Sequence, residues 1–228
     1  MNDSGLISSP TLDSSPCQER AVAYIGKEWL LAPERAAIHL PTSTAIVADL
    51  HLGYDLTRCQ IGEAVPTVSV EEQWRPLDTL ISCHDVQKLI VAGDLVERSH
   101  GNLIASLFKD WLLERNVELI AIVPGNHDGG IDLEGLVPPF ESGIQVGNWQ
   151  VVHGDKRLPS GKIVLGHHHP CAKWGRLSAP CFLFRDNRLV LPAFSQDAAG
   201  GNVRSSRRWK GYRCYVIAGS KVLDFGEL

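Results

Sequence analysis

The sequence contains no apolar run long enough to cross a membrane, no Cys-x-x-Cys pair, no Gly-x-Ser-x-Gly motif and no repeat of solenoid length. The first absence argues against a transmembrane protein. The second leaves the cysteines without the spacing of a zinc or dithiol redox site, and the third removes the usual signature of a serine nucleophile. What remains is an ordinary soluble composition, with 44% hydrophobic and 21% charged residues.

Residues 1–20 also lack the basic start and the apolar core of a secretory signal. They are rich in Ser, Pro, Asp and Thr and show no periodicity, which predicts a disordered tail. Residues 21–228 contain no linker, so we expect them to form one domain. In a chain without a signal we expect a cytoplasmic protein with reduced, structural thiols. The six cysteines are Cys17, Cys59, Cys83, Cys171, Cys181 and Cys214.

The charge is distributed unevenly along the chain, although its net value is only −4. Residues 1–114 carry 16 acidic and 8 basic side chains, whereas residues 115–228 carry 10 and 14. A basic second half is consistent with an anionic substrate. An uneven but solvated surface is the alternative interpretation.

Three apolar runs in the first half are separated by two amphipathic segments, which predicts a βαβαβ unit with a parallel sheet and right-handed crossovers. The first amphipathic segment begins with a capping box formed by Ser69 and Glu72, and Asn102 can cap the second. The polar segment from Gly53 to about residue 68 is predicted to be a loop. The expected strands are Ala45–Ala48, Leu89–Ala92 and Leu119–Val123, preceded by a hairpin around Gly26-Lys27 and a strand at Ala36–Leu40.

Short alternating apolar segments recur through the second half, without a long helix between them. Turn sequences such as Gly147-Asn148, Asp186-Asn187 and Gly219-Ser220 separate neighbouring segments. The whole pattern predicts an α/β (α+β) fold, in which a second, mostly antiparallel sheet packs on the first with helices outside. The strands expected in this half are Ile144–Val146, Trp149–His153, Ile163–Leu165, Cys181–Phe184, Arg188–Leu191, Arg213–Ile217 and Lys221–Asp224.

Metal-ligand and proton-transfer side chains follow each of the three apolar strands of the first half. They are Asp49 and His51 after the first strand, Asp94 after the second, and Asn126, His127 and Asp128 after the third. The carboxyl ends of parallel strands meet at one edge of a sheet, and in open α/β sheets this is the edge where ligands bind. We therefore expect these side chains to form one site.

The later histidines extend the pattern. They are His153, at the end of a predicted strand, and His167, His168 and His169 after the next one. An i, i+2 spacing puts Asp49 and His51, and likewise His167 and His169, on one side of an extended segment. Asp, Asn and His suit borderline divalent ions such as Mn²⁺, Fe or Zn²⁺. Asp94 lies alone between the pairs and is the natural bridge between two ions. Taken alone, His153 could be an ordinary strand histidine, and His167–His169 could be a chance cluster on a turn. Together and in this order, the motifs predict a metal site.

The order of these motifs over residues 45–170, DxH, GD, GNHD, H and GHxH, resembles the calcineurin-like metallophosphoesterases. The resemblance implies a four-layer sandwich, with two packed mixed β-sheets flanked by helices, which agrees with the pattern above. It implies a binuclear phosphoric ester hydrolase, expected to act on phosphodiesters. A hydroxide bridging two divalent ions, Mn²⁺ being the first candidate, would attack the phosphate.

The resemblance also implies a role for each residue of the motifs. The ligands of one ion would be Asp49, His51 and His169, those of the other Asn126, His153 and His167, and the bridge Asp94. His127 would stabilise the developing charge or protonate the leaving alkoxide. Asp128 would orient His127, and His168 would be a variable position that binds no metal.

A narrower resemblance, to DNA-ligase-associated phosphoesterases, rests on ADLHLG at 48–53, GHHHP at 166–170 and LPAF at 191–194. It implies a nuclease working with DNA-repair proteins as an alternative function. Nuclease-type relatives often read GDxxH, but here the histidine position is Glu97. A carboxylate there would repel a second phosphate, which argues against a nuclease unless His100 substitutes. A non-catalytic scaffold is a further alternative, for which lost ligands would be expected.

A basic segment near the C-terminus supplies the candidate substrate contacts, Arg207 and Arg208. Trp209 and Tyr212 are interleaved with its arginines. Arginine binds phosphate bidentately and aromatic rings stack on bases, so this composition suits a groove for single-stranded nucleic acid. The alternative is a solvated connector whose Trp209 packs into the second sheet.

Overall fold

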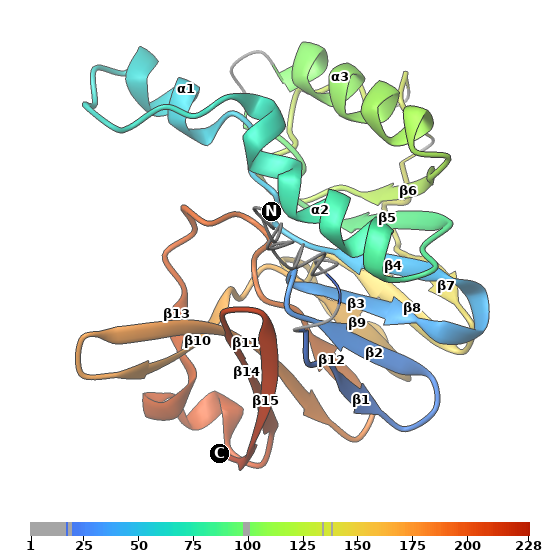
Figure 1. Cartoon of the computed structure of the whole chain (residues 1–228), viewed down its shortest axis with the longest axis vertical. Helices are drawn as coiled ribbons and strands as arrows, with labels where there is room; N and C mark the ends of the chain where they lie inside the picture. Colours follow the sequence, from blue (N-terminus) through green and yellow to red (C-terminus); the bar gives the residue numbers. More distant parts are fainter. Residues whose placement is uncertain (1–16, 18–19, 98–100, 134, 138) are drawn as a thin grey trace, which may run out of the picture.

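The computed structural model describes residue 17 and residues 20–97, 101–133, 135–137 and 139–228. Two β-sheets face each other, and α-helices cover the outer face of the first sheet (Figure 1). The predicted pair of packed mixed sheets with helices outside is confirmed. Among the described residues the α-helices pack on the first sheet, and two 3-10 turns, Val203–Ser205 and Arg207–Trp209, lie between strands β13 and β14 of the second. None of the described helices is both long and apolar enough to cross a membrane.

The first sheet contains six strands in chain order. They are β1 (Ala23–Ile25), β2 (Trp29–Ala32), β3 (Ala36–His39), β4 (Thr44–Val47), β5 (Lys88–Ala92) and β6 (Glu118–Val123). The first four strands pair antiparallel, and β4, β5 and β6 pair parallel. The predicted hairpin, the strand after it and the parallel unit are therefore confirmed. Parallel pairing places the carboxyl ends of β4, β5 and β6 side by side.

Two long helices connect the parallel strands, as predicted, but two local predictions are wrong. Helix α2 (Val70–Cys83) begins where the Ser69 side chain accepts the Glu72 N–H at 3.2 Å. Helix α3 (Gly101–Glu114) already includes Asn102, whose side chain accepts the N–H of Asp132 instead of capping the helix. The predicted loop after Gly53 contains a short helix, α1 (Tyr54–Gln60).

The second sheet contains the seven strands expected in the second half and two more. They are β7 (Ile144–Val146), β8 (Trp149–Val152), β9 (Lys162–Leu165), β10 (Pro170–Trp174), β11 (Leu177–Arg185), β12 (Arg188–Val190), β13 (Gly201–Asn202), β14 (Arg213–Ala218) and β15 (Lys221–Glu227). Most of the pairs are antiparallel, whereas the pairs β8–β9, β9–β12 and β10–β13 are parallel. The unpredicted strand β10 directly follows the last histidine motif and forms a hairpin with β11.

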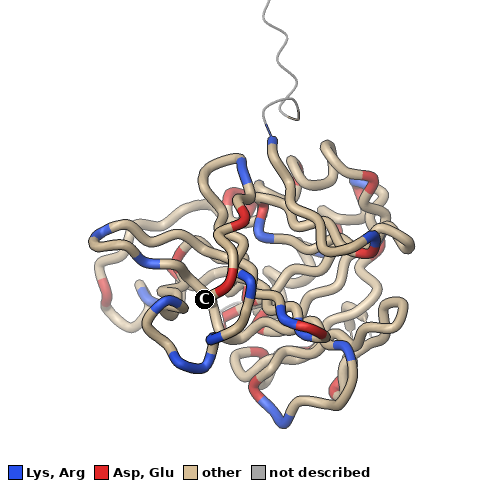
Figure 2. Tube along the Cα trace, turned by 90° about the horizontal axis from the view of Figure 1, so that it is seen from below, with Lys and Arg blue, Asp and Glu red and all other residues tan. Residues whose placement is uncertain are grey.

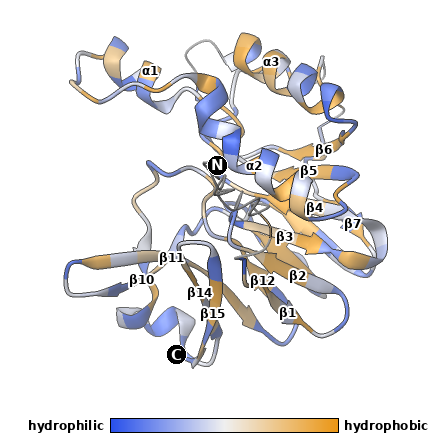
Figure 3. Cartoon of the chain, in the orientation of Figure 1, coloured by the Kyte–Doolittle hydropathy of each residue, from blue (hydrophilic) through white to orange (hydrophobic). Residues whose placement is uncertain are grey.

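Apolar side chains fill the space between the sheets and the space between the first sheet and the helices. Trp29, Ile46 and Phe182 belong to the inter-sheet core, and Trp74 and Phe108 belong to the core beneath the helices. Figure 3 shows hydrophobic colours on the strands of the first sheet and polar colours at many of the connecting turns. Burial on both faces explains why β4, β5 and β6 read as continuous apolar runs.

The prediction that the cysteines are all reduced is wrong. Cys17 forms a disulfide with Cys83 at the end of α2. Sequence spacing gave no signal, because the partners lie 66 residues apart and outside any short motif. Cys59, Cys171, Cys181 and Cys214 are free. Most of the predicted disordered tail lies outside the described residues, although Arg20 forms an ion pair with the buried Glu34.

Removing this disulfide is expected to lower the free energy of unfolding by ~2–4 kcal/mol, since the crosslink restricts the unfolded chain over a long loop. Thermal unfolding of Cys17→Ser without reductant should show a lower Tm than that of the wild type. Cys59→Ser, which removes an exposed free thiol, is the control. Equal Tm values for Cys17→Ser and wild type would contradict the stabilising role.

Candidate metal centre

The loops that follow β4 and β5 run side by side and are joined through their backbones. The N–H of Asp49 donates to the carbonyl of Gly93 at 3.0 Å, and the N–H of His51 donates to the carbonyl of Asp94 at 2.9 Å. The GNHD motif, which ends at Asp128, lies in the loop after β6, the next parallel strand. The parallel order of the strands thus brings the DxH, GD and GNHD motifs to one edge of the sheet (Figure 1).

The predicted ligands have unusual backbone conformations. Nine described residues other than glycine have positive φ, and five of them are predicted metal ligands. Those five are Asp49, His51, Asp94, His167 and His169, with φ between 42° and 66°. Residues with side chains rarely adopt this region, and such strain concentrates at functional sites. The fold therefore holds these side chains in orientations that ordinary extended or helical backbone would not give them.

The first predicted ligand set converges as expected. Single ligand atoms from Asp49, His51 and His169 lie within 4.8 Å of one another, and His169 Nε2 is 3.5 Å from Asp49 Oδ1. Asp49 is fully buried. Its Oδ2 accepts the N–H of His167 at 2.8 Å, but its Oδ1 has no hydrogen-bond partner. A buried carboxylate oxygen without a donor is costly, and a cation at this position would satisfy it.

The second predicted ligand set converges around one nitrogen of His153. Its Nδ1 donates to the carbonyl of Ala92 at 3.1 Å, which leaves the Nε2 lone pair free to bind a metal. The Nε2 atom lies 3.3 Å from Asn126 Oδ1 and 3.2 Å from His167 Nδ1. Three ligand-type atoms at these separations fit around one ion, since metal–ligand bonds are ~2.0–2.2 Å long.

Asp94 lies between the two sets. Its Oδ2 is 3.5 Å from His153 Nε2 and 3.9 Å from His51 Nε2. Its Oδ1 accepts the backbone N–H of His127 at 2.8 Å, which fixes the carboxylate plane. A carboxylate at this position could contact an ion in each set. The donor set of imidazole, carboxylate and amide oxygen suits the borderline divalent ions that the sequence predicts.

Two motif glycines are required by close packing at this site. A Cβ at Gly93, which has φ of 88°, would lie 1.9 Å from His153 Nδ1. A Cβ at Gly125 would lie 2.2 Å from Asp94 Oδ1. Both contacts are far shorter than van der Waals distance, so the glycines of the GD and GNHD motifs allow the ligands to approach the backbone.

Glu97 is a site residue whose role was not predicted from the sequence. It is 8% exposed, and its Oε1 lies 2.9 Å from His51 Nδ1 and 3.1 Å from His127 Nδ1. Burial acts to raise its pKa, but the hydrogen bond from His51 and the nearby His127 outweigh burial and hold the pKa of Glu97 below its ordinary value. Glu97 therefore orients a predicted metal ligand and the predicted catalytic histidine together. His100, the alternative histidine, lies outside the described residues.

The assignment of Asp128 as the group that orients His127 needs correction. The Asp128 carboxylate accepts the backbone N–H groups of Asp94, Leu95 and Gly125 at 2.8–2.9 Å. Burial raises the pKa of Asp128, and the N–H donors of Gly125 and Leu95 act against that rise. Asp128 therefore ties the GD and GNHD loops together. The carboxylate that contacts the His127 ring is Glu97, because it reaches the histidine from the adjacent loop.

The basic segment lies beside the last histidine motif. Arg208 donates to His168 Nε2 at 2.6 Å, and the His168 ring packs on Trp209. Burial and the neighbouring Arg208 lower the pKa of His168 to about 4, so this ring is neutral at pH 7 and can accept. Several Lys and Arg positions gather near the C-terminus in Figure 2. Arg207 and Arg208 form a short 3-10 turn with Trp209 and are exposed.

The prediction that the aromatic residues of this segment stack on bases is wrong. Trp209 and Tyr212 are buried in the core of the second sheet, so the connector interpretation of Trp209 is confirmed. Arg213 is paired with Asp224 at 2.6 Å. Of this segment, the exposed arginines Arg207 and Arg208 remain candidates for contacting a substrate. Arg208 contacts the last histidine motif, through His168.

Comparisons with known proteins agree with this geometry. A solved structure, that of the Pseudomonas putida nuclease MPE, superposes with a TM-score of 0.71 at 22% sequence identity, and the match covers 90% of this chain and 100% of that chain. At this identity the likeness shows the fold. No curated protein sequence matches the chain.

The family model of the calcineurin-like phosphoesterases matches residues 42–201. The matched segment contains every predicted metal ligand, and these side chains converge in two sets around Asp94. The chain therefore belongs to the calcineurin-like phosphoesterase family and is a metal-dependent phosphoesterase.

Proposed function

We propose that this protein is a phosphodiesterase that works with two divalent ions, Mn²⁺ being the first candidate and Fe or Zn²⁺ the alternatives. The position of Asp94 Oδ2, between His153 Nε2 at 3.5 Å and His51 Nε2 at 3.9 Å, carries the proposal. Bound ions would supply an activated water and neutralise the charge of the phosphoryl oxygens. The predicted ligands would hold these ions at the carboxyl edge of the first sheet.

His127 is the proposed proton donor to the leaving alkoxide. Its Nδ1 faces Glu97, and a carboxylate can only accept, so the Nδ1 carries a proton. Proton donation to the leaving alkoxide then requires the doubly protonated ring, which keeps Nδ1–H on Glu97 and gives the proton at Nε2 to the leaving oxygen. Half of the His127 side chain is exposed, unlike the ligands Asp49 and His153, which fits a group that meets substrate from solvent.

A nuclease is the second candidate. The structural neighbour named above is a nuclease, and the match covers 90% of this chain. The sequence argument against a nuclease supposed that Glu97 faces a second phosphate. Glu97 is instead buried against His51 and His127, so its charge is compensated inside the protein. Protein partners from DNA repair stay a prediction. A scaffold is disfavoured because every predicted ligand is present.

A metal and substrate panel tests the proposal. Elemental analysis of the purified protein is expected to find two divalent ions per chain after loading with Mn²⁺. The loaded protein should hydrolyse bis(p-nitrophenyl) phosphate faster than p-nitrophenyl phosphate, and chelation should abolish both activities. A clear preference for the monoester would contradict the phosphodiesterase assignment, and release of nucleotides from single-stranded DNA would favour the nuclease.

The exposed arginines are expected to contribute to binding of a nucleic-acid substrate. Arg207→Ala with Arg208→Ala should weaken binding of a single-stranded oligonucleotide and flatten its salt dependence, since fewer phosphates are neutralised. Hydrolysis of a small nitrophenyl diester should be spared. Fluorescence anisotropy over a salt series measures the effect, with Lys27→Ala and Lys221→Ala together as the charge-matched control at exposed positions outside the basic segment. Identical slopes for wild type and the arginine variant would exclude the role.

A further inference from the structure

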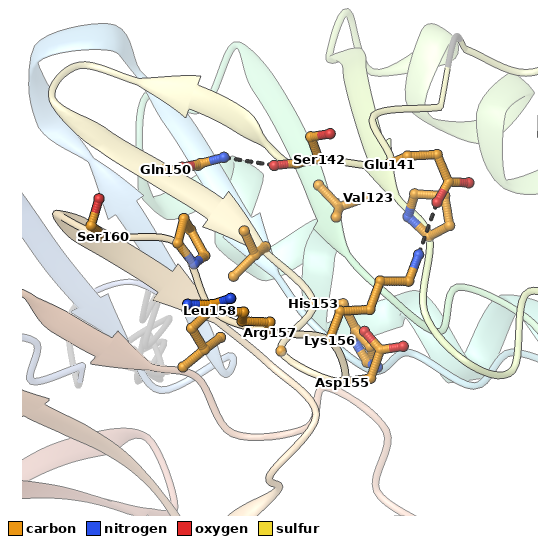
Figure 4. Close-up of a pocket in the computed structure, with 14 residues that line it drawn as sticks. Val123, Glu141, Ser142, Gln150, His153, Asp155, Lys156, Arg157, Leu158 and Ser160 are labelled. Carbon is orange, nitrogen blue, oxygen red and sulfur yellow. Dashed lines mark hydrogen bonds and ion pairs between the residues drawn. The ribbon is translucent and has the colours of Figure 1, made fainter.

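Two cavities lie beside the metal centre, one next to each predicted ion. The first, of about 560 Å³, is lined by His153 and by the loop that follows it (Figure 4). Its lining contains the basic residues Lys156 and Arg157 and the acidic residues Glu141 and Asp155. Lys156 Nζ lies 2.9 Å from Glu141. This cavity has no net charge to attract an anion.

The second cavity, of about 270 Å³, is lined by His169, a ligand of the other predicted set. Arg35 and Lys173 line it, and the lining residues that the structure describes include no Asp or Glu. The hydroxyl groups of Ser178 and Ser195 also line it. Two cations and two hydroxyls beside a predicted metal ligand form a surface complementary to an anion.

Arg35 is held with part of its guanidinium directed away from protein acceptors. It has φ of 63°, and its Nη1 donates to the carbonyls of Ala193 and Phe194 at 3.2 and 3.3 Å and of Ser195 at 2.5 Å. Within the described part of the chain no acceptor contacts its Nε or Nη2, and neither atom is both buried and unpaired. These donors therefore reach the cavity.

The charge of Arg35 is poorly compensated by the protein. Burial lowers the pKa of Arg35, and no carboxylate of the described residues forms an ion pair with it. Guanidinium groups fit phosphate with two parallel N–H donors, and a bound anion would replace the hydration that burial removes. Lys173, on β10, is half-buried and presents a second positive charge to the same space.

We propose that this cavity binds a second phosphate of the substrate, adjacent to the ester that is hydrolysed at the metal centre. The proposal rests on the phosphodiesterase function proposed above. The second phosphate comes either from the neighbouring nucleotide of a strand or from the terminal phosphate of a small phosphorylated diester. Arg35 and Lys173 bind it and select the substrate, while the reacting ester stays with the metal ligands.

Three short thymidine substrates distinguish these sources. TpT has one diester and no other phosphate, pTpT adds a terminal phosphate, and TpTpT adds a second diester. Wild type should hydrolyse pTpT or TpTpT with a lower KM than TpT. Lys173→Gln should raise the KM for the preferred substrate by about tenfold or more, with kcat unchanged. Its KM for TpT and for bis(p-nitrophenyl) phosphate should equal that of wild type.

A matched control and a second variant keep the test decisive. Arg176→Gln removes a positive charge from the same hairpin outside the cavity lining and should change nothing. Arg35→Lys keeps the charge but loses the bidentate fork, so it should raise the same KM. An effect confined to pTpT identifies a terminal phosphate, and one confined to TpTpT identifies a strand. Equal KM values for all three substrates in wild type, or an equal loss on all of them in Lys173→Gln, would overturn the subsite.

The proposed function and the subsite can fail separately. Absence of any diester hydrolysis by the Mn²⁺-loaded wild type contradicts the function alone. In that case calorimetric titration of pTpT and TpTpT into wild type and Lys173→Gln tests the subsite. Weaker binding by Lys173→Gln supports it, and equal binding overturns it.

Discussion

Asp94→Asn is expected to abolish ester hydrolysis and to lower the occupancy of both metal positions. The Asp94 Oδ2 atom approaches a histidine of each ligand set, so its negative charge acts on both ions. Asparagine keeps the size of the side chain and the carbonyl that accepts the His127 N–H, but it removes that charge. Elemental analysis and hydrolysis of bis(p-nitrophenyl) phosphate measure the two effects.

Asp186→Asn is the control, because Asp186 is an exposed carboxylate in the turn between β11 and β12. Its metal content and turnover should match those of wild type. If Asp94→Asn retained one fully occupied site and substantial activity, the two ions would not share Asp94. A normal Tm for Asp94→Asn would show that the loss is local to the centre.

His127→Ala is expected to slow turnover by ~10²–10⁴-fold while metal content stays nearly unchanged. Since His127 is proposed to protonate the leaving group, the loss should be larger for poor alkoxide leaving groups than for nitrophenolate. Metal analysis is essential here, because His127 also lies within 4.8 Å of ligand atoms of His51 and Asp94. Loss of metal would identify His127 as a ligand. Equal losses for both leaving groups would exclude proton donation.

Glu97→Gln tests how much the contact with the Glu97 carboxylate contributes to the action of His127. Glutamine keeps the shape of the side chain, but its charge is gone and its amide must rotate to accept from both His51 and His127. We expect a smaller defect than that of His127→Ala, with the same dependence on the leaving group. A Glu97→Gln variant with wild-type kinetics would show that the contact is only structural.

The sequence determined the position of the metal site, and the physical reason is that the parallel strands are buried on both faces. Continuous apolar runs identified β4, β5 and β6, and parallel pairing necessarily places their carboxyl ends at one edge. Asp49, Asp94 and Asn126 could therefore be grouped before any coordinates were known. The alternating strands of the second half were equally readable, because a half-buried strand repeats every two residues.

Only the tertiary structure decided which side chains meet when they belong to different loops. Glu97 and Asp128 both follow a motif aspartate or histidine, and the family resemblance implied that Asp128 orients His127. The pairing of the loops after β4 and β5 instead turns Glu97 towards both histidines, while Asp128 is occupied by backbone N–H groups. Contacts between loops depend on backbone φ values that side-chain patterns do not encode.

Sequence patterns also do not predict contacts between residues far apart in the chain, or which residues near its ends are buried. Cys17 meets Cys83, and Arg35 meets the LPAF segment, across separations that carry no local pattern. Trp209 stands among arginines and looks exposed in the sequence, yet it is buried because β14 brings its segment back onto the second sheet. Local periodicity specified the strands and their chemistry, whereas the packing of the two sheets decided which polar groups share a cavity.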